Sequence, residues 1–225
     1  MSSTTHAVED YLKTIYLISR ACARASTTQI AEALQVTPAS VTGMLRKLAN
    51  TDPPLVVYHK HRGATLTPEG ERIAIEIVRH HRLLETFLHQ ILGYDWDEVH
   101  AEADRLEHVI SEAFEERIAQ VLGDPTHDPH GDPIPTRDLE MPPPSETRLS
   151  DLRPPQQAVI VRVSDSDPAL LRYLSEYSLR PQTHITITRY TAFDENISLQ
   201  VNGCEEDIVL GPRATRQIFV EVVPS

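Results

Sequence analysis

The chain has 225 residues, of which 40% are hydrophobic and 24% charged, a globular composition with room for two or three small domains. No stretch reaches the roughly 20 apolar residues of a membrane span, and the first residues lack the pattern of a secretory signal. The two cysteines stand far apart in no spaced motif, which argues against a disulfide scaffold or a zinc knuckle. We therefore expect a cytoplasmic protein with no membrane partner.

The net charge of −12 is distributed unevenly along the chain. Residues 1–72 carry eight Lys and Arg against six Asp and Glu, whereas residues 73–225 carry thirteen against twenty-seven. Because binding to phosphate depends on the local field, the slightly basic N-terminal part is compatible with a nucleic-acid partner. The acidic remainder is compatible with binding of cations.

The first fifty residues predict three helices. Apolar residues recur at helical spacing over 9–19, and a second, shorter helix is expected over 26–34. After a break of three residues, Thr37 supplies a capping hydroxyl and Pro38 stands at the first position of a third helix, where its missing N–H costs nothing.

Two β-prone runs, 55–60 and 64–67, follow and predict a hairpin whose tip is His59-Lys60-His61-Arg62. Helix, short turn, helix and hairpin are the order of a winged helix-turn-helix, which places its second helix in the major groove of DNA. Short, hydroxyl and basic side chains there are candidates for contacts to bases and phosphates. The candidates are Thr37, Ser40, Thr42, Gly43, Arg46, Lys47, Lys60 and Arg62. The alternative is a helical core whose basic residues simply face solvent.

Two long helices are predicted next, over 68–92 and 97–121, separated by Gly93-Tyr94-Asp95. The second helix carries four potential metal ligands at spacings that put them on neighbouring lines of one face: His100, Asp104, Glu107 and His108. The apolar face of the first helix ends in His81 and Glu85, and Asp10 lies on the N-terminal helix.

Buried charged side chains are costly unless they are paired or bind a metal, so this group predicts either surface ion pairs or a metal centre. Carboxylates and imidazoles without thiolates suit Mn²⁺ or Fe²⁺ more than a structural zinc ion.

Prolines are dense between residues 123 and 151, where no regular structure is expected. Beyond residue 157 a helix is predicted over 168–177, together with five short strands that form a small β-barrel. The strands are expected at 159–161, 184–188, 197–201, 208–209 and 218–222.

Five segments resemble the diphtheria-toxin-repressor family of iron- or manganese-dependent transcriptional repressors: Glu9–Tyr16, Thr37–Leu48, His81–Glu85, Val99–His108 and His130–Pro135. The similarity extends over nearly the whole chain and is most specific at Val99–His108. The resemblance implies a mainly α protein with small β parts. Its parts would be a winged helix-turn-helix domain (1–74), a helical dimerisation and metal-binding domain (75–144), a proline-rich linker (145–156) and an SH3-like β-barrel (157–225). It also implies a homodimer on a double-stranded DNA operator, with no organic cofactor and no enzymatic activity.

The resemblance implies two metal ions per protomer. One site would use Asp10, Asp104, Glu107 and His108. The other would use His81, Glu85 and His100, with Asp167 of the SH3-like domain as a further ligand and Leu170 at its partner position.

Two positions separate the metal types within the family. Iron-responsive members have a methionine where Asp10 stands and a cysteine where Asp104 stands, whereas manganese-responsive members have acidic residues at both. We therefore expect Mn²⁺ rather than Fe²⁺ to activate this regulator, a repressor of metal-uptake genes acting in metal homeostasis. Lys13 departs from the manganese type, which usually has a glutamate there, and Gly43 departs from the base-contacting glutamine of the iron type.

Three alternatives stay open at this point. The chain could be an iron-dependent repressor of the same family, a two-metal helical hydrolase, or a winged-helix regulator of an organic ligand whose acidic face is only structural. Stoichiometric metal uptake without hydrolytic turnover would exclude the hydrolase, and operator binding without metal would favour the organic-ligand regulator.

Overall fold

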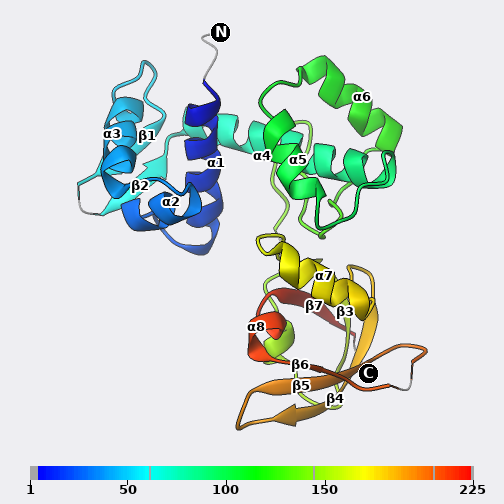
Figure 1. The fold of residues 1–225 in the computed structure, drawn as a ribbon. Coiled ribbons are helices and arrows are strands. Elements are labelled where there is room, and N and C mark those ends of the chain that lie inside the picture. The colour runs from blue at the N-terminus through cyan, green and yellow to red at the C-terminus, as the bar shows by residue number, and fades with distance from the viewer. Residues whose placement is uncertain (1–4, 61, 144, 205, 224–225) are drawn as a thin grey trace. The chain divides into compact units, whose positions relative to one another are not determined.

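The computed structural model of the protein describes residues 5–60, 62–143, 145–204 and 206–223 (Figure 1). His61 of the predicted hairpin tip and Pro144 of the predicted domain boundary lie outside these ranges. The chain forms two compact units. The first comprises residues 1–81, 106–115 and 135–141, and the second comprises 82–105, 116–134 and 142–225.

The first unit contains the predicted winged helix. Its elements are α1 (His6–Ala21), α2 (Thr27–Ala33), α3 (Pro38–Ala49), β1 (Val56–His59), β2 (Gly63–Leu66) and the start of α4 (Pro68–Gln90). Ser26 caps α2 in a capping box with Gln29, and the hydroxyl of Thr37 accepts a hydrogen bond from the backbone N–H of Ser40 at the start of α3. Each cap satisfies backbone donors that a helix start leaves without a partner, so these helices begin where the sequence predicted.

One hydrophobic core holds the winged helix together. Buried side chains from all six elements meet in it, and the fully buried ones include Leu12, Ile15, Ile30, Leu45 and Leu48. β1 and β2 pair in antiparallel register, with Val56 opposite Leu66. The apolar spacing read from the sequence therefore corresponds to the faces that the helices bury.

The single helix predicted over 97–121 is wrong. The chain forms α5 (Val99–Leu106) and α6 (Glu112–Leu122), with residues 107–111 in a turn between them. The backbone carbonyl of Glu107 accepts a hydrogen bond from Nδ1 of His80 at 3.0 Å. In a continuous helix this carbonyl would instead accept from a backbone N–H one turn later. The hydroxyl of Ser111 accepts from the backbone N–H of Phe114 and restarts the helix. The side chains that break the helix belong to other elements or cap the next one, so apolar periodicity could not reveal them.

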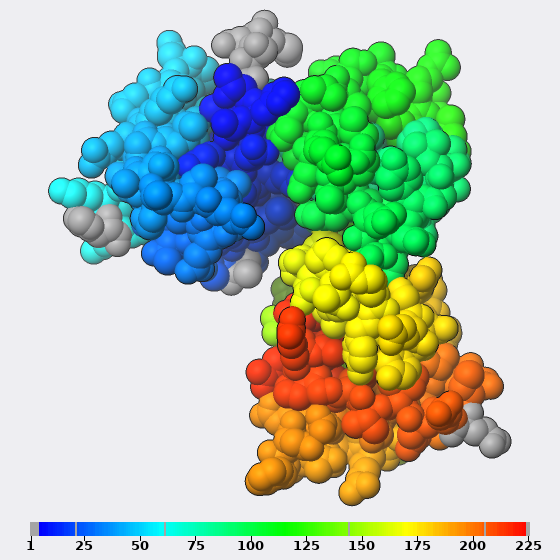
Figure 2. Space-filling view, in the orientation of Figure 1, coloured from blue at the N-terminus to red at the C-terminus, as the bar shows by residue number. Residues whose placement is uncertain are grey.

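The second unit contains a five-stranded antiparallel sheet in the order β6-β5-β4-β3-β7. Its strands are β3 (Gln157–Val163), β4 (His184–Thr191), β5 (Asn196–Val201), β6 (Ile208–Leu210) and β7 (Ile218–Val223). All five predicted strands are confirmed, as is α7 (Pro168–Glu176), whose atoms lie against the strands in Figure 2. The single turns η1 (Leu149–Asp151) and α8 (Pro212–Thr215) are too short to be recognised by periodicity.

A loop and a tryptophan fasten this sheet to the helical part of the same unit. The backbone N–H of Val163 donates to the carbonyl of His130 at 2.8 Å, and Gly131 lies so close to β3 that a Cβ atom would come 1.9 Å from the carbonyl oxygen of Val161. The indole N–H of Trp96, a residue 2% exposed, donates to the hydroxyl of Ser175 on α7. These contacts fix the segment that follows β3.

No described helix combines the length and apolar character of a membrane span.

Candidate metal centres

Three of the four residues predicted for the first metal site meet within the first unit. Asp10 lies on α1, whereas Glu107 and His108 lie in the turn after α5. His108 Nε2 is 2.8 Å from Asp10 Oδ1 and 3.4 Å from Glu107 Oε1. The three side chains offer ligand atoms that all lie within 4.8 Å of one another. We call these three residues the α1 cluster. It unites the first helix of the winged helix with residues almost a hundred positions away.

Glu9 orients the imidazole of this cluster, and the sequence reasoning missed it. Glu9 Oε2 lies 2.7 Å from His108 Nδ1, on the opposite side of the ring from Asp10. The ring of His6 stacks on that of His108 with centroids 5.0 Å apart. A carboxylate on one ring nitrogen directs the other nitrogen towards its ligand position, as in many metal sites. In the sequence, the only indication of this role was that Glu9 stands directly before Asp10 on α1.

Glu107 is a buried carboxylate held by two basic side chains. It is 1% exposed, and its Oε2 lies 2.7 Å from the Lys13 ammonium and 2.5 Å from His81 Nδ1. Burial alone raises the pKa of Glu107, but the hydrogen bond with His81 and the charge of Lys13 outweigh burial and lower the pKa below its ordinary value. The carboxylate is therefore an anion that is already compensated by cationic neighbours.

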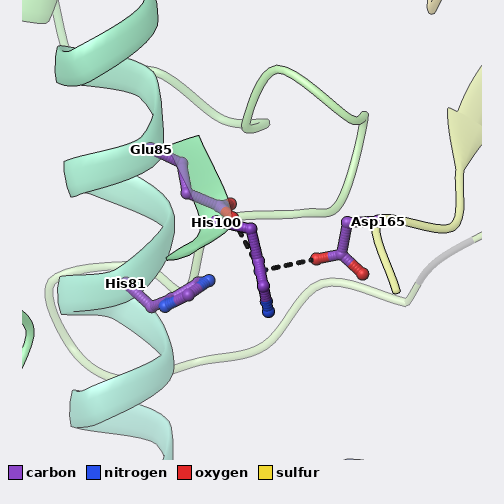
Figure 3. A group of neighbouring side chains, drawn as sticks. All are labelled: His81, Glu85, His100 and Asp165. Atoms are coloured by element: carbon purple, nitrogen blue, oxygen red, sulfur yellow. Dashed lines mark hydrogen bonds and ion pairs between the residues drawn. The ribbon is translucent and has the colours of Figure 1, made fainter. Parts of the chain in front are cut away.

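A second cluster lies within the second unit and joins α4, α5 and the segment after β3 (Figure 3). His100 Nδ1 is 3.0 Å from Glu85 Oε1 and 3.3 Å from Asp165 Oδ2, and His100 Nε2 is 3.6 Å from Asp104 Oδ2. His81, also drawn in Figure 3, precedes Glu85 by one turn of α4. We call Glu85, His100 and Asp165 the α4 cluster.

The charges of the α4 cluster are strongly coupled. Burial lowers the pKa of His100, but Asp165 and Glu85 outweigh that effect and raise it to about 11. Burial raises the pKa of Asp165, and its hydrogen bond with His100 brings it below the ordinary value. Without a metal ion the imidazole is thus protonated and serves as the cation of the cluster.

Asp165, and not Asp167, is the carboxylate that the C-terminal domain brings to His100. The side chain of Asp167 instead accepts from the backbone N–H groups of Ala169 and Leu170 as the N-cap of α7, and its Oδ2 lies 2.8 Å from Arg213. An aspartate directly before a helix that opens with proline is a typical N-cap, so capping of α7 accounts for the position of the Asp167 side chain. Asp167 as a ligand stays a prediction, and the structure places Asp165, which was not predicted, next to His100.

Glu85 also belongs to a third, fully buried group with Asp128 and His130. Nε2 of His130 donates to the carbonyl of Trp96 at 2.7 Å, while Nδ1 lies 3.8 Å from Glu85 Oε2 without a hydrogen-bond partner among the described residues. Burial raises the pKa of Asp128 well above its ordinary value. Burial lowers the pKa of His130, and the nearby Glu85 raises it to about 9. The sequence reasoning had not proposed Asp128 or His130 as ligands, although His130 opens one of the segments that carry the family resemblance.

These groups fit a divalent metal ion. Their donors are carboxylate oxygens and imidazole nitrogens, most of them buried, and a buried imidazole nitrogen without a partner faces a carboxylate in the third group. Neither of the two cysteines, Cys22 and Cys204, belongs to any of these groups of described residues.

The predicted DNA-contact residues lie on the outer face of the winged helix. Val41, Leu45 and Leu48 turn the opposite side of α3 into the core. Of the eight candidates, Thr42 is half-buried and donates to the carbonyl of Pro38, and the others are exposed: Thr37, Ser40, Gly43, Arg46, Lys47, Lys60 and Arg62. The exposed basic side chains on α3 and the hairpin are free to meet a phosphate backbone.

A winged helix with an exposed basic face, joined to buried clusters of carboxylates and imidazoles, defines a metal-dependent DNA-binding regulator. Three family models match the chain in succession. They are the iron dependent repressor N-terminal DNA binding domain at residues 3–64, the iron dependent repressor metal binding and dimerisation domain at 67–136, and the FeoA domain at 147–222.

Known proteins agree with these matches. The iron-dependent repressor IdeR of Mycobacterium leprae (strain TN) is 32% identical over 236 residues, which cover 99% of this chain and all of that protein. The HTH-type transcriptional regulator MntR of Lysinibacillus sphaericus (strain C3-41) is 40% identical over 118 residues, which cover 52% of this chain and 83% of that protein. A solved structure described as a manganese-dependent transcriptional repressor in complex with manganese superposes with a TM-score of 0.88 at 37% identity, covering 96% of this chain and all of that one.

The chain belongs to the iron-dependent repressor family, to which the diphtheria toxin repressor belongs. It is a metal-dependent transcriptional repressor with a DNA-binding domain, a metal-binding and dimerisation domain and a C-terminal SH3-like FeoA domain. The predicted fold class is confirmed. The hydrolase alternative is wrong, because the matching domains and relatives are those of DNA-binding repressors and not of enzymes.

Proposed function

We propose that this repressor responds to Mn²⁺ in preference to Fe²⁺, holds two ions per protomer and, as a homodimer on a double-stranded operator, represses genes of metal uptake. The observation that carries the proposal is the donor set of the α1 cluster. Asp10 and Glu107 present carboxylate oxygens and His108 an imidazole nitrogen, all hard or intermediate donors. Sulfur ligands strengthen the binding of later transition metals more than that of Mn²⁺. A site without sulfur therefore favours Mn²⁺ more than a site with sulfur does.

The α4 cluster supports a second ion. Glu85, His100 and Asp165 would hold it, and His81 one turn earlier on α4 is a further candidate ligand. His100 must release its proton before its Nδ1 can act as a ligand, which makes metal uptake dependent on pH.

The position of the α1 cluster suggests how metal and DNA binding are coupled. Asp10 belongs to α1, whose Leu12 and Ile15 share one hydrophobic core with the recognition helix α3, whereas Glu107 and His108 lie in the segment matched by the dimerisation domain model. A bound divalent cation would neutralise the carboxylates of this cluster. His108, oriented by Glu9, and the buried Glu107 then keep α1 at a fixed place relative to residues 107–108, and the recognition helix with it.

An iron-activated repressor of the same family is the second candidate. It is supported by the names of relatives such as IdeR, whereas MntR and the manganese-dependent repressor structure are named for the other metal. The donor chemistry at Asp10 and Asp104 favours manganese, because the iron type has sulfur ligands at both positions.

The test is binding to the promoter region of the gene neighbourhood as a function of free Mn²⁺ or Fe²⁺, without oxygen and at constant pH. Wild type is expected to be activated by Mn²⁺, and Asp10→Met combined with Asp104→Cys is expected to shift activation towards Fe²⁺. His108→Ala serves as the control, since it removes a ligand without adding a softer one and should weaken the response to both metals. A double variant that keeps the metal order of wild type would refute the manganese assignment.

A further inference from the structure

Lys13 stands one turn after Asp10 on α1 and turns its ammonium into the α1 cluster rather than into solvent. Its side chain is 12% exposed, and its Nζ lies 2.7 Å from Glu107 Oε2 and 3.0 Å from His81 Nδ1. These three residues belong to the same compact unit. A buried ammonium is costly unless it is paired, and here a buried carboxylate supplies the pair.

The carboxylate that Lys13 contacts belongs to the α1 cluster. Glu107 Oε1 lies 3.4 Å from His108 Nε2, while Glu107 Oε2 holds the Lys13 ammonium and, at 2.5 Å, the hydrogen bond with His81 Nδ1. A carboxylate binds an ammonium or a divalent cation through the same lone pairs. The lysine and a metal ion in the α1 cluster would therefore compete for the charge of Glu107.

We propose that Lys13 is a tethered competitor cation, whose ammonium holds Glu107 in the metal-free protein and must be displaced when a divalent ion binds the α1 cluster. The lysine then raises the metal concentration at which the repressor responds, and it keeps Glu107 in place when the metal is absent. The inference rests on the proposed function, because it assumes that the α1 cluster binds metal.

Removal of the ammonium has two effects of opposite sign. Lys13→Met keeps the apolar stem but leaves the buried Glu107 with His81 as its one remaining basic partner among those described above, so the metal-free variant melts at a lower temperature than wild type. The same change removes the competing ammonium from Glu107 Oε2 and makes the cluster more negative by one charge, so Mn²⁺ binds on the order of tenfold more tightly. If Lys13 had only a structural role, its removal would lower the melting temperature and weaken Mn²⁺ binding together. Tighter binding in a less stable protein is the distinguishing result.

The experiment is Mn²⁺ binding by equilibrium dialysis and titration calorimetry on the full chain without DNA. Lys13→Met is expected to bind about tenfold more tightly, whereas Lys13→Arg, which keeps the charge, is not. Arg24→Met is the matched control, since it removes one exposed positive charge from the same unit and should stay within about twofold of wild type. If Lys13→Met does not fold, Lys13→Gln gives the same comparison, because its amide can still donate to Glu107.

Folded Lys13→Met or Lys13→Gln protein that binds Mn²⁺ no more tightly than wild type overturns the inference and leaves the proposed function intact. A wild type that takes up no Mn²⁺ overturns both. The two failures are therefore distinguishable in one set of titrations.

Discussion

Gly131 lies where the loop of residues 128–133 meets β3, and its replacement by alanine is expected to detach the loop from the strand. The backbone has φ +88° at this position, in the left-handed region, and a Cβ would come 1.9 Å from the carbonyl oxygen of Val161 and 2.9 Å from the Cα of Arg162. Both neighbours are backbone atoms of a paired strand, so they cannot move aside as the end of a flexible side chain would.

The cost can be worked out from its parts. A left-handed conformation costs a residue with a Cβ about 1–2 kcal/mol, and the hydrogen bond from Val163 to the carbonyl of His130 is worth about 1 kcal/mol. The sum is ~2–3 kcal/mol before any overlap is counted. For a chain of this size the melting temperature should fall by roughly 5–10 °C.

Gly123 offers a matched control. It also has a left-handed backbone, with φ +74°, but a Cβ there would meet nothing within 4 Å. Gly123→Ala therefore reports the backbone cost alone, and the difference between the two variants isolates the overlap with β3.

The assay is thermal unfolding of the metal-free protein, followed by the number of Mn²⁺ ions bound per protomer. Gly131→Ala should melt several degrees below Gly123→Ala. It should also lose the ion proposed for the α4 cluster, because Asp165 follows the strand from which the loop detaches. Equal melting temperatures and an unchanged number of ions in the two variants would refute the reasoning.

Two further predictions concern charge. Lys47→Ala and Arg62→Ala should weaken DNA binding about equally across sequences and reduce the slope of log K against log salt by roughly one each, as expected for lost phosphate contacts; unchanged affinity at several salt concentrations would contradict this placement of the DNA face. In the metal-free protein the pKa of His100 rises on folding from 6.5 to about 11, so its stabilising contribution is complete below about pH 6.5 and is lost as the pH rises towards 11. Urea unfolding between pH 6 and pH 10 should show a gap between wild type and His100→Asn that narrows with pH, and a constant gap would argue against the ion pairing of His100.

Much of the fold was predictable because its determinants are local. A hydroxyl followed by proline or a capping box marks a helix start from a few neighbouring residues, as at Ser26 and Thr37. Apolar spacing on α1 and α3 corresponds to the buried faces, and the alternation of β-prone runs located all five strands of the C-terminal domain. The residue types of the candidate metal clusters were also recognisable, since helical spacing groups imidazoles and carboxylates on one face.

The tertiary structure alone decided how those groups are used. The turn at residues 107–111 depends on His80, which lies on another helix, and the role of Lys13 depends on Glu107, which is 94 positions away in the chain. Asp167 caps α7, and Asp165 lies beside His100, a placement that depends on the path of the chain after β3. A buried charge is stabilised by whichever partner the packing brings within about 3 Å, and distance in space is not encoded in the spacing of one helix. For that reason the sequence by itself determined the fold class and the kinds of side chain in the clusters, whereas the pairing of each charge and the path of the chain through the clusters were decided by the packed structure.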